Sequence, residues 1–275
     1  MTDQPDLTVQ GDADKWILFD RQTQDGYPLV VLARTGNAAV ERSLQQETVT
    51  IVRCEADSSI VNDRGMPGHT DRIYQIEDQI ANQLEAQKIM AFHVASVTGD
   101  GLRRLVYSHS AALDFEPILE QFRVEGYSLT SALADDRDSI IALVSPTSIE
   151  RQLNGDLGVI SNLEKHGDDG RAVRKTDFWF YDARPALETA AVELQPWGYT
   201  VDHWLSDPEG VVLTTNTAVD FETFRNITPV LVGIADRHGL NYDGWETFVV
   251  LPESEAAQPQ KPKSLLSRLF GKKDN

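Results

Sequence analysis

The strongest constraint on the fold is a pattern of residues that occurs twice along the chain. One copy starts at Asp100 and the other at Asp169, and each runs Asp-Gly, extended segment, short helical segment, Gly-Tyr, extended segment, acidic turn, extended segment. In the first copy the last extended segment is residues 140–144. This strand–helix–strand–strand order predicts a split βαβ, ferredoxin-like domain in each half, in which the crossover pairs two parallel strands within a mainly antiparallel sheet. The predicted fold class is therefore α+β.

Alternating and helical patterns extend the predicted domain of the first half. They predict strands at 15–20, 27–34 and 47–56, a loop at 58–70, a helix at 71–87 and a hairpin through Gly99-Asp100-Gly101. Together with the first copy of the repeat, these segments predict a domain over residues 15–145.

Two helix signals organise the second half. Thr147 and Glu150 have the spacing of a capping box, so we expect a helix to begin there and a domain boundary near Pro146. Residues 220–239 are apolar at helical spacing. Pro229 either kinks this predicted helix or lies in the first turn of a second one.

The composition changes after the second predicted domain, which covers residues 147–250. Residues 251–275 contain Pro, Glu and Gln up to position 260 and then carry five basic residues, which predicts a flexible linker and a basic amphipathic tail. This tail is either a separate interaction element or a solvated end. The residues expected to form its interaction face are Leu265, Leu266, Arg268, Leu269 and Phe270.

The net charge of the chain is formally -18, with a pI near 4.6. Such a charge disfavours direct binding of nucleic acid, because that binding depends on Lys and Arg releasing counterions from phosphates. The acidity either serves solubility alone or suits a basic protein partner. The single cysteine, Cys54, excludes an internal disulfide, and no apolar run approaches membrane-spanning length, so we expect a cytoplasmic protein.

Motifs that carry chemistry are mostly missing from the sequence. No glycine-rich phosphate loop or nucleophile elbow occurs, and Cys54 lacks the neighbours that would make its thiol reactive. His93 and His109 could face each other across the predicted hairpin, although single histidines on half-buried strands are the more ordinary interpretation. The sequence therefore predicts no catalytic residue, no cofactor and no metal.

Aromatic residues are concentrated in the second half. The segment 177–181 places large rings on both faces of a strand, so that either Phe178 and Phe180 or Trp179 and Tyr181 point away from the helices. Exposed aromatic residues on an open sheet usually indicate binding, and base stacking on RNA would also require basic surroundings. A protein partner is therefore favoured over RNA.

Residues 147–250 resemble the RraB family, the regulators of ribonuclease E activity. The resemblance rests on LEKHGDDGRAVRK (163–175), DFWFY (177–181), WGYTV (197–201) and YDGWETF (242–248). It implies a ferredoxin-like, non-catalytic protein that binds the scaffold region of ribonuclease E and inhibits RNA decay. Glu246 departs from the glycine that is usual in the family.

Residues 15–145 resemble a bacterial domain family of unknown function, which implies no activity. This second resemblance rests on Trp16 with DGYP (25–28), on YQIEDQIANQLE (74–85) and on VASVTGDGLRRLVYS (94–108).

The favoured function is that of a non-catalytic regulator that binds a ribonuclease E-type endonuclease or another basic protein. The residues expected to form the protein-binding surface are Phe178, Trp179, Tyr181, Trp245 and Glu246. For Trp245, a place in the core beside the Asp243-Gly244 turn is the main expectation, and a part in the surface is the alternative. Two other classes stay open: an enzyme or ligand-binding protein with a site between the domains, and weak contact of the tail with anionic lipid.

Overall fold

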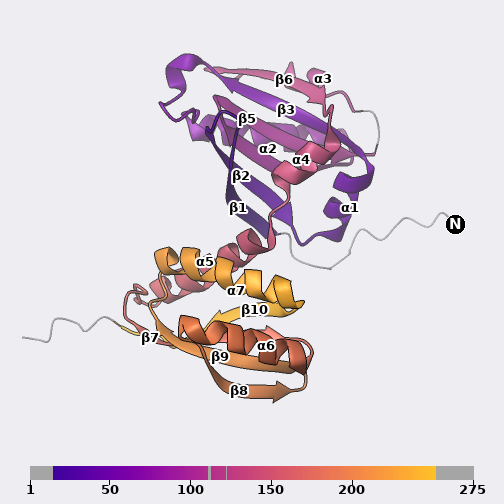
Figure 1. Ribbon diagram of the computed structural model, residues 1–275. Helices are drawn as coiled ribbons and strands as arrows, with labels where there is room; N and C mark the ends of the chain where they lie inside the picture. Colours follow the sequence, from indigo (N-terminus) through magenta and orange to yellow (C-terminus); the bar gives the residue numbers. More distant parts are fainter. Residues whose placement is uncertain (1–14, 111–112, 122, 252–275) are drawn as a thin grey trace, which may run out of the picture. The chain divides into compact units, whose positions relative to one another are not determined.

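The computed structural model describes residues 15–110, 113–121 and 123–251 (Figure 1). The chain divides into two compact units, residues 1–151 and 152–275. Each unit contains one antiparallel sheet and several helices, which confirms the predicted α+β class. The predicted tail residues Leu265, Leu266, Arg268, Leu269 and Phe270 lie outside the described residues.

The first unit is built on a six-stranded sheet with the order β1-β2-β4-β5-β3-β6. Its strands are β1 (Lys15–Gln22), β2 (Pro28–Thr35), β3 (Thr48–Ala56), β4 (Ala91–Gly99), β5 (Leu102–His109) and β6 (Tyr127–Leu133). Its helices are α1 (Ala38–Gln46), the single turn η1 (Ser58–Ile60), α2 (Thr70–Ala86), α3 (Glu116–Leu119) and α4 (Arg137–Val144).

A ferredoxin-like core lies within this sheet. The segment β3-α2-β4-β5-α3-β6 follows the βαββαβ order, and its strands are arranged β6-β3-β5-β4. The β1–β2 hairpin adds two strands beside β4. The expected pairing of parallel strands is wrong, because β3 lies between the crossover strands β5 and β6 and pairs with both in the antiparallel sense.

Different helices cover the two faces of the first sheet. On one face, α1 and α4 pack over buried residues of β1, β2 and β4, including Phe19, Val31 and Val97. On the other face, α2 and α3 pack over β5 and β3, with Ile76 and Ile80 fully buried. Within the described residues, the core beneath α2 and α3 contains no residue of β1 or β2.

Residues 140–144 were expected to form a strand, and this expectation is wrong. They belong to α4, which begins because the Asp136 carboxylate accepts a hydrogen bond from the Ser139 backbone N–H at 3.2 Å. The acidic turn is thus a helix cap. The first copy of the repeat is therefore strand–helix–strand–helix, so the two copies are not structurally equivalent.

The second unit is a four-stranded ferredoxin-like domain with the strand order β10-β7-β9-β8. Its strands are β7 (Arg174–Tyr181), β8 (Thr200–Ser206), β9 (Glu209–Thr217) and β10 (Asn241–Glu246). Its helices are α5 (Ser148–Lys165), α6 (Arg184–Leu194), the single turn η2 (Gln195–Trp197) and α7 (Phe221–His238). Helix α5 begins at the predicted capping box, and α7 runs through Pro229 without interruption.

The segment after β10 is fastened to the start of β7 by a buried ion pair between Asp168 and Arg174. The Asp168 carboxylate also accepts a hydrogen bond from the Val250 N–H at 2.7 Å, and Arg174 donates to the Phe248 carbonyl at 3.2 Å. We call this arrangement the C-terminal latch. The Arg174 hydrogen bonds hold the pKa of Asp168 well below its usual range.

Candidate protein-binding face

The strand β7 separates the aromatic residues of the second unit onto two faces. Phe178 and Phe180 are buried beneath the helices, whereas Trp179 and Tyr181 lie on the opposite face and are half-buried. The sequence left both assignments open because every residue from 178 to 181 is large and aromatic. The structure assigns Trp179 and Tyr181 to the face that the helices leave uncovered.

Two residues of the predicted binding surface lie in the core instead. Phe178 is fully buried and Trp245 is 7% exposed. The reason is their register: Trp245 pairs with Phe178 across β10 and β7, so both side chains point toward the helices. The Trp245 ring stacks on Phe224 with centroids 4.2 Å apart. The structural expectation for Trp245 is the one that agrees with this position.

Trp245 also donates a hydrogen bond to a buried acid that the sequence reasoning missed. Its Nε1 lies 2.9 Å from Asp156 Oδ1, and the Thr228 hydroxyl donates to Asp156 Oδ2 at 2.6 Å. Burial raises the pKa of Asp156, while these hydrogen bonds act in the opposite direction. The available signal was a lone carboxylate inside an apolar helical stripe of α5, between Leu153 and Ile160.

The Asp243-Gly244 turn of the YDGW motif is a backbone irregularity. The pairing of β10 with β7 shifts between Tyr242 and Gly244, and Gly244 has φ +111°, which favours glycine. This shift brings Trp245 to the helix side of the sheet. The motif therefore closes the sheet and orients the donor to Asp156.

The uncovered side of the second sheet is called the open face here. Trp179 meets His203 edge to face at 6.2 Å, and Val212 between their strands is completely buried beneath this face. Gly210 lets the Tyr181 ring lie close to the strand, because a Cβ at Gly210 would be 2.8 Å from Tyr181 Cδ1. The open face consists of Lys175, Asp177, Trp179, Tyr181, His203, Leu205, Val212 and Glu246.

Charged groups border these aromatic rings. Lys175 Nζ lies 2.8 Å from Asp202 Oδ1 and 3.3 Å from Asp177 Oδ1. Asp202 also accepts from His203 Nδ1 at 2.8 Å. The hydrogen bonds from Lys175, and then from His203, lower the pKa of Asp202, so this carboxylate is ionised at neutral pH. Glu246, the departure from the RraB pattern, is exposed at the β10 edge and adds a further negative charge.

A Ser–His–Glu arrangement in the first unit does not have the geometry of a nucleophile and its base. Ser96 Oγ donates to Glu77 Oε1 at 3.0 Å. His93 Nε2 lies 3.0 Å from Ser96 Oγ and 3.2 Å from the Ala95 carbonyl, so its proton is directed toward both oxygens. A base that activates serine must accept the serine proton, and here that proton goes to Glu77. Glu77 is in turn paired with Arg103.

The two histidines considered for a metal are not opposite each other. His93 pairs with Tyr107, whereas His109 pairs with Ala91 and its Nε2 lies 2.9 Å from Thr50 Oγ1. Among the residues that the structure describes, no three His, Cys, Asp or Glu side chains cluster as metal ligands would. Burial raises the pKa of Cys54 to about 12, which keeps its thiol protonated.

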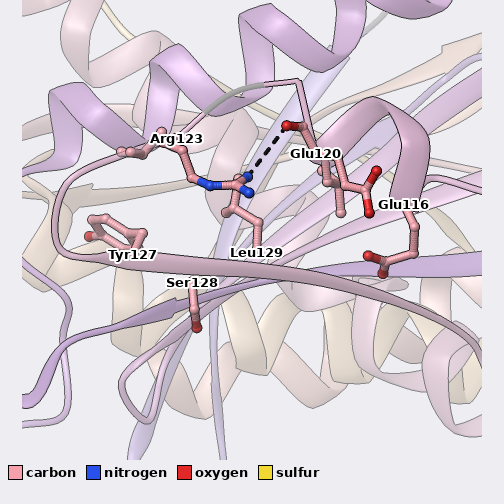
Figure 2. A pocket seen from close by; sticks show the side chains of 8 residues that line it. Glu116, Glu120, Arg123, Tyr127, Ser128 and Leu129 are labelled. Carbon is pink, nitrogen blue, oxygen red and sulfur yellow. Dashed lines mark hydrogen bonds between the residues drawn. The ribbon is translucent and has the colours of Figure 1, made fainter.

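A surface pocket of about 350 Å³ lies between α3 and β6 (Figure 2). Figure 2 shows Glu116 and Glu120 toward one end and Arg123 and Tyr127 toward the other. Arg123 donates to the Glu120 carbonyl at 3.5 Å, the limit for a hydrogen bond. The sequence indicated no site here, and the pocket is lined by Glu116, Leu119, Glu120, Arg123, Val124, Tyr127, Ser128 and Leu129.

The open face lies in the part of the chain that matches a family model. Residues 155–247 match the family model described as Regulator of ribonuclease activity B. The match confirms the RraB resemblance of the second half and includes Trp179, Tyr181 and Glu246. It does not extend to residues 15–145, whose resemblance to a family of unknown function stays a prediction.

No curated protein matches the chain. None of the helices in the described ranges is both long enough and apolar enough to cross a membrane.

Proposed function

We propose that the protein is a non-catalytic regulator of a ribonuclease E-type endonuclease and that it binds the enzyme through the open face. The observation that carries this proposal is the match of residues 155–247 to a family of ribonuclease regulators. Within that same segment, the open face supplies aromatic rings and carboxylates that a basic partner can bind. The first unit then accompanies the regulatory unit without a catalytic role.

The open face suits arginine side chains of a basic partner. A guanidinium group stacks on the face of an aromatic ring such as Trp179 and pairs with a carboxylate at the same time. Asp177 and Glu246 border Trp179 and lie on neighbouring strands, where they pair directly across β7 and β10. Arginine-rich scaffold segments of an endonuclease offer the complementary chemistry.

The negative charge of the chain favours the same kind of partner. Residues 1–260 contain 20 basic and 42 acidic residues, which gives them a charge of -22. Opposite charges accelerate the encounter of two proteins and disfavour wrong partners. The same charge opposes direct competition for RNA, so inhibition of decay would act through the enzyme.

The test is binding of the purified full-length protein to the arginine-rich scaffold region of a ribonuclease E, measured by calorimetry. We expect Trp179→Ala with Tyr181→Ala to weaken binding by about tenfold or more, which corresponds to the loss of buried aromatic contacts at an interface. Trp197→Ala is the matched control, because Trp197 is 62% exposed and lies outside the open face.

An RNA-decay assay with the same variants connects binding to regulation. The wild type and Trp197→Ala should slow cleavage by the full-length endonuclease, and the double variant should not. Equal inhibition by all three proteins would reject the open face as the binding site. An endonuclease that neither binds nor responds to the wild type would reject the proposed function itself.

A further inference from the structure

Two arginines lie side by side on the first sheet. Arg53 of β3 and Arg104 of β5 are directly opposite each other in the strand register, so their side chains share one face. Arg104 also pairs with Val97 of β4, which is buried in the core beneath α1 and α4, so this is the face that α1 and α4 partly cover. Arg53 is exposed and Arg104 is half-buried. We call these two residues the arginine pair.

The arginine pair has no acidic partner among the residues that the structure describes. Neither guanidinium group forms an ion pair or a hydrogen bond within those ranges. Like charges directly opposite each other on neighbouring strands destabilise a sheet. Burial, and then the positive charge of Arg53, lower the pKa of Arg104, while Asp100 acts in the opposite direction. The pair therefore costs stability by itself, as expected of groups that bind an anion from outside the chain.

Three other arginines of the first unit show the ordinary arrangement. Each binds a carboxylate, in the pairs Arg21–Glu150, Arg72–Glu125 and Arg103–Glu77. The chain has 43 acidic residues and only 25 Lys and Arg. Because carboxylates are abundant, the missing partner of two adjacent arginines does not come from a shortage of acids. It favours an anion supplied from solution.

One carboxylate lies near the arginine pair on this face. Glu55 follows Arg53 by two positions, and it is the only acid that strand alternation places on this face of β1 to β6. It is exposed and forms no ion pair with either arginine in the described part of the chain. Thr130 of β6 is directly opposite Arg53 and is exposed, so its hydroxyl adds a hydrogen-bond donor.

The acidic residues of the two covering helices lie toward the other end of the strands. Glu41 of α1 accepts a hydrogen bond from the Gly36 N–H, just beyond the end of β2. Asp138 at the start of α4 lines a hollow together with Thr48. Thr48 is separated from Arg53 by about 17 Å along β3, at roughly 3.4 Å per residue. These acids are therefore too far away to neutralise the arginine pair.

A phosphate group matches the arginine pair better than a carboxylate does. A guanidinium group binds two oxygens at once, so one arginine saturates a carboxylate in the bidentate geometry. A phosphate group has three terminal oxygens and a charge of about -1.5 to -2 at neutral pH, so two arginines can share it. We propose that the arginine pair binds the phosphate group of a small phosphorylated ligand, and that the Thr130 hydroxyl donates to the same group. This site lies in the first unit and does not depend on the function proposed above.

The surroundings of the arginine pair favour a small ligand over nucleic acid. The uncharged residues beside the pair on this face are Ile51, Val97, Val106 and Thr130, none of which has a ring that could stack on a base. The net charge of -18 also opposes the approach of a polyanion. A single phosphate group carries far less charge and meets less of this repulsion.

The first test measures binding of inorganic phosphate to the full-length protein in a low-salt chloride buffer, from the broadening of the phosphorus NMR resonance. Arg53→Gln and Arg104→Gln should each weaken binding by about tenfold or more, the effect of losing charge-assisted hydrogen bonds. Arg72→Gln is the matched control. It removes the same charge from α2, on the opposite face of the sheet, where Arg72 already pairs with Glu125. It should change binding less than about twofold.

A second test separates the arginine geometry from charge and from folding. Arg53→Lys combined with Arg104→Lys keeps both charges but loses the two planar forks, and it should bind phosphate about tenfold more weakly than the wild type. Without phosphate, Arg53→Gln should unfold at the same urea concentration as the wild type or at a higher one, because it removes the like-charge contact. Saturating phosphate should raise the urea midpoint of the wild type and of Arg72→Gln, but not that of Arg53→Gln.

Several results would overturn the proposal. Wild-type affinity of the double lysine variant would reduce the site to general electrostatic attraction. Tighter binding of succinate than of phosphate would assign the pair to a dicarboxylate. Sedimentation with phosphatidic acid vesicles that is lost in Arg53→Gln, without binding of free phosphate, would assign it to a lipid headgroup. A lower urea midpoint of Arg53→Gln would give the pair a structural role, and equal binding by the wild type and both glutamine variants, or no binding at all, would show that there is no site.

Discussion

At the scale of single residues, the Trp245–Asp156 hydrogen bond can be tested separately from the packing of the ring. Trp245→Phe keeps an aromatic ring against Phe224 but removes the Nε1–H donor at 2.9 Å. Because the Asp156 carboxylate is buried, we expect a loss of about 1–3 kcal/mol in the free energy of unfolding. Urea unfolding measures it. Trp197→Phe, at an exposed site, should leave stability unchanged, and an equal loss in both variants would contradict the assignment.

The Asp168–Arg174 pair gives stability a pH dependence of known sign. The folded-state pKa of Asp168 is depressed, so the pair stabilises the protein above the unfolded-state pKa near 3.9 and loses this effect as pH falls toward the folded value. Asp168→Asn leaves Arg174 buried without its counterion and should cost about 3–5 kcal/mol at pH 7.

This cost should shrink below about pH 4, since the wild-type carboxyl then loses its advantage. Chemical unfolding of both proteins from pH 7 to pH 3 measures the difference. A difference that stays constant over this range would show that Asp168 acts through packing rather than charge.

At the scale of elements, β6 is an edge strand whose backbone is partly covered. Glu116 of α3 accepts hydrogen bonds from the Ser131 N–H at 2.8 Å and from its hydroxyl at 3.0 Å. An uncovered edge invites pairing with another chain. Glu116→Ala should therefore increase self-association, measured as a rise in apparent mass with concentration by light scattering. Glu116→Gln keeps an acceptor oxygen and should behave like the wild type.

The elements also show what the sequence can and cannot predict. The strands at 15–20, 27–34 and 47–56 and the helices at 71–87 and from Thr147 followed from simple periodicity and a cap. Helix α4 was missed because Asp136 was interpreted as part of a solvated turn, although the same residue type is a good N-cap. Helix α1 is short and was not predicted, although Asn37 before it is a residue type that favours an N-cap.

The candidate site was predictable only in part, since strand alternation cannot choose a face when both faces are aromatic. The faces of Phe178 and Trp179 are assigned by the pairing of β7 with β10, which is a tertiary contact that the local sequence does not contain. The structural role of Asp156 could not be predicted, because its hydrogen-bond partners Thr228 and Trp245 are far from it in the sequence.

At the scale of the whole molecule, helix α5 crosses the boundary between the two compact units. The units divide after Arg151, whereas α5 begins at Ser148 behind the Thr147–Glu150 capping box. We expect a fragment of residues 147–251 to unfold cooperatively and to be about 1 kcal/mol more stable than one of residues 152–251, which lacks the box.

Thermal and urea unfolding of the two fragments measure this difference. Thr147→Ala in the longer fragment should remove most of it, because the Thr147 hydroxyl accepts from the Glu150 N–H at 3.2 Å. If the longer fragment shows no cooperative transition, the second unit depends on residues 1–146, and the predicted domain over 147–250 is rejected.

The C-terminal latch determines how the second unit would bear mechanical force. Val250 is held by Asp168, and the Thr247 hydroxyl donates to the Lys175 carbonyl at 2.8 Å, so the exit of the chain is fastened to β7, an interior strand. A pull on residues beyond 251 therefore loads these contacts in parallel before it reaches β10. Without the latch the same pull would peel an edge strand one hydrogen bond at a time. A partner that binds residues beyond 251 can therefore exert force on the chain without displacing Trp245 from the core.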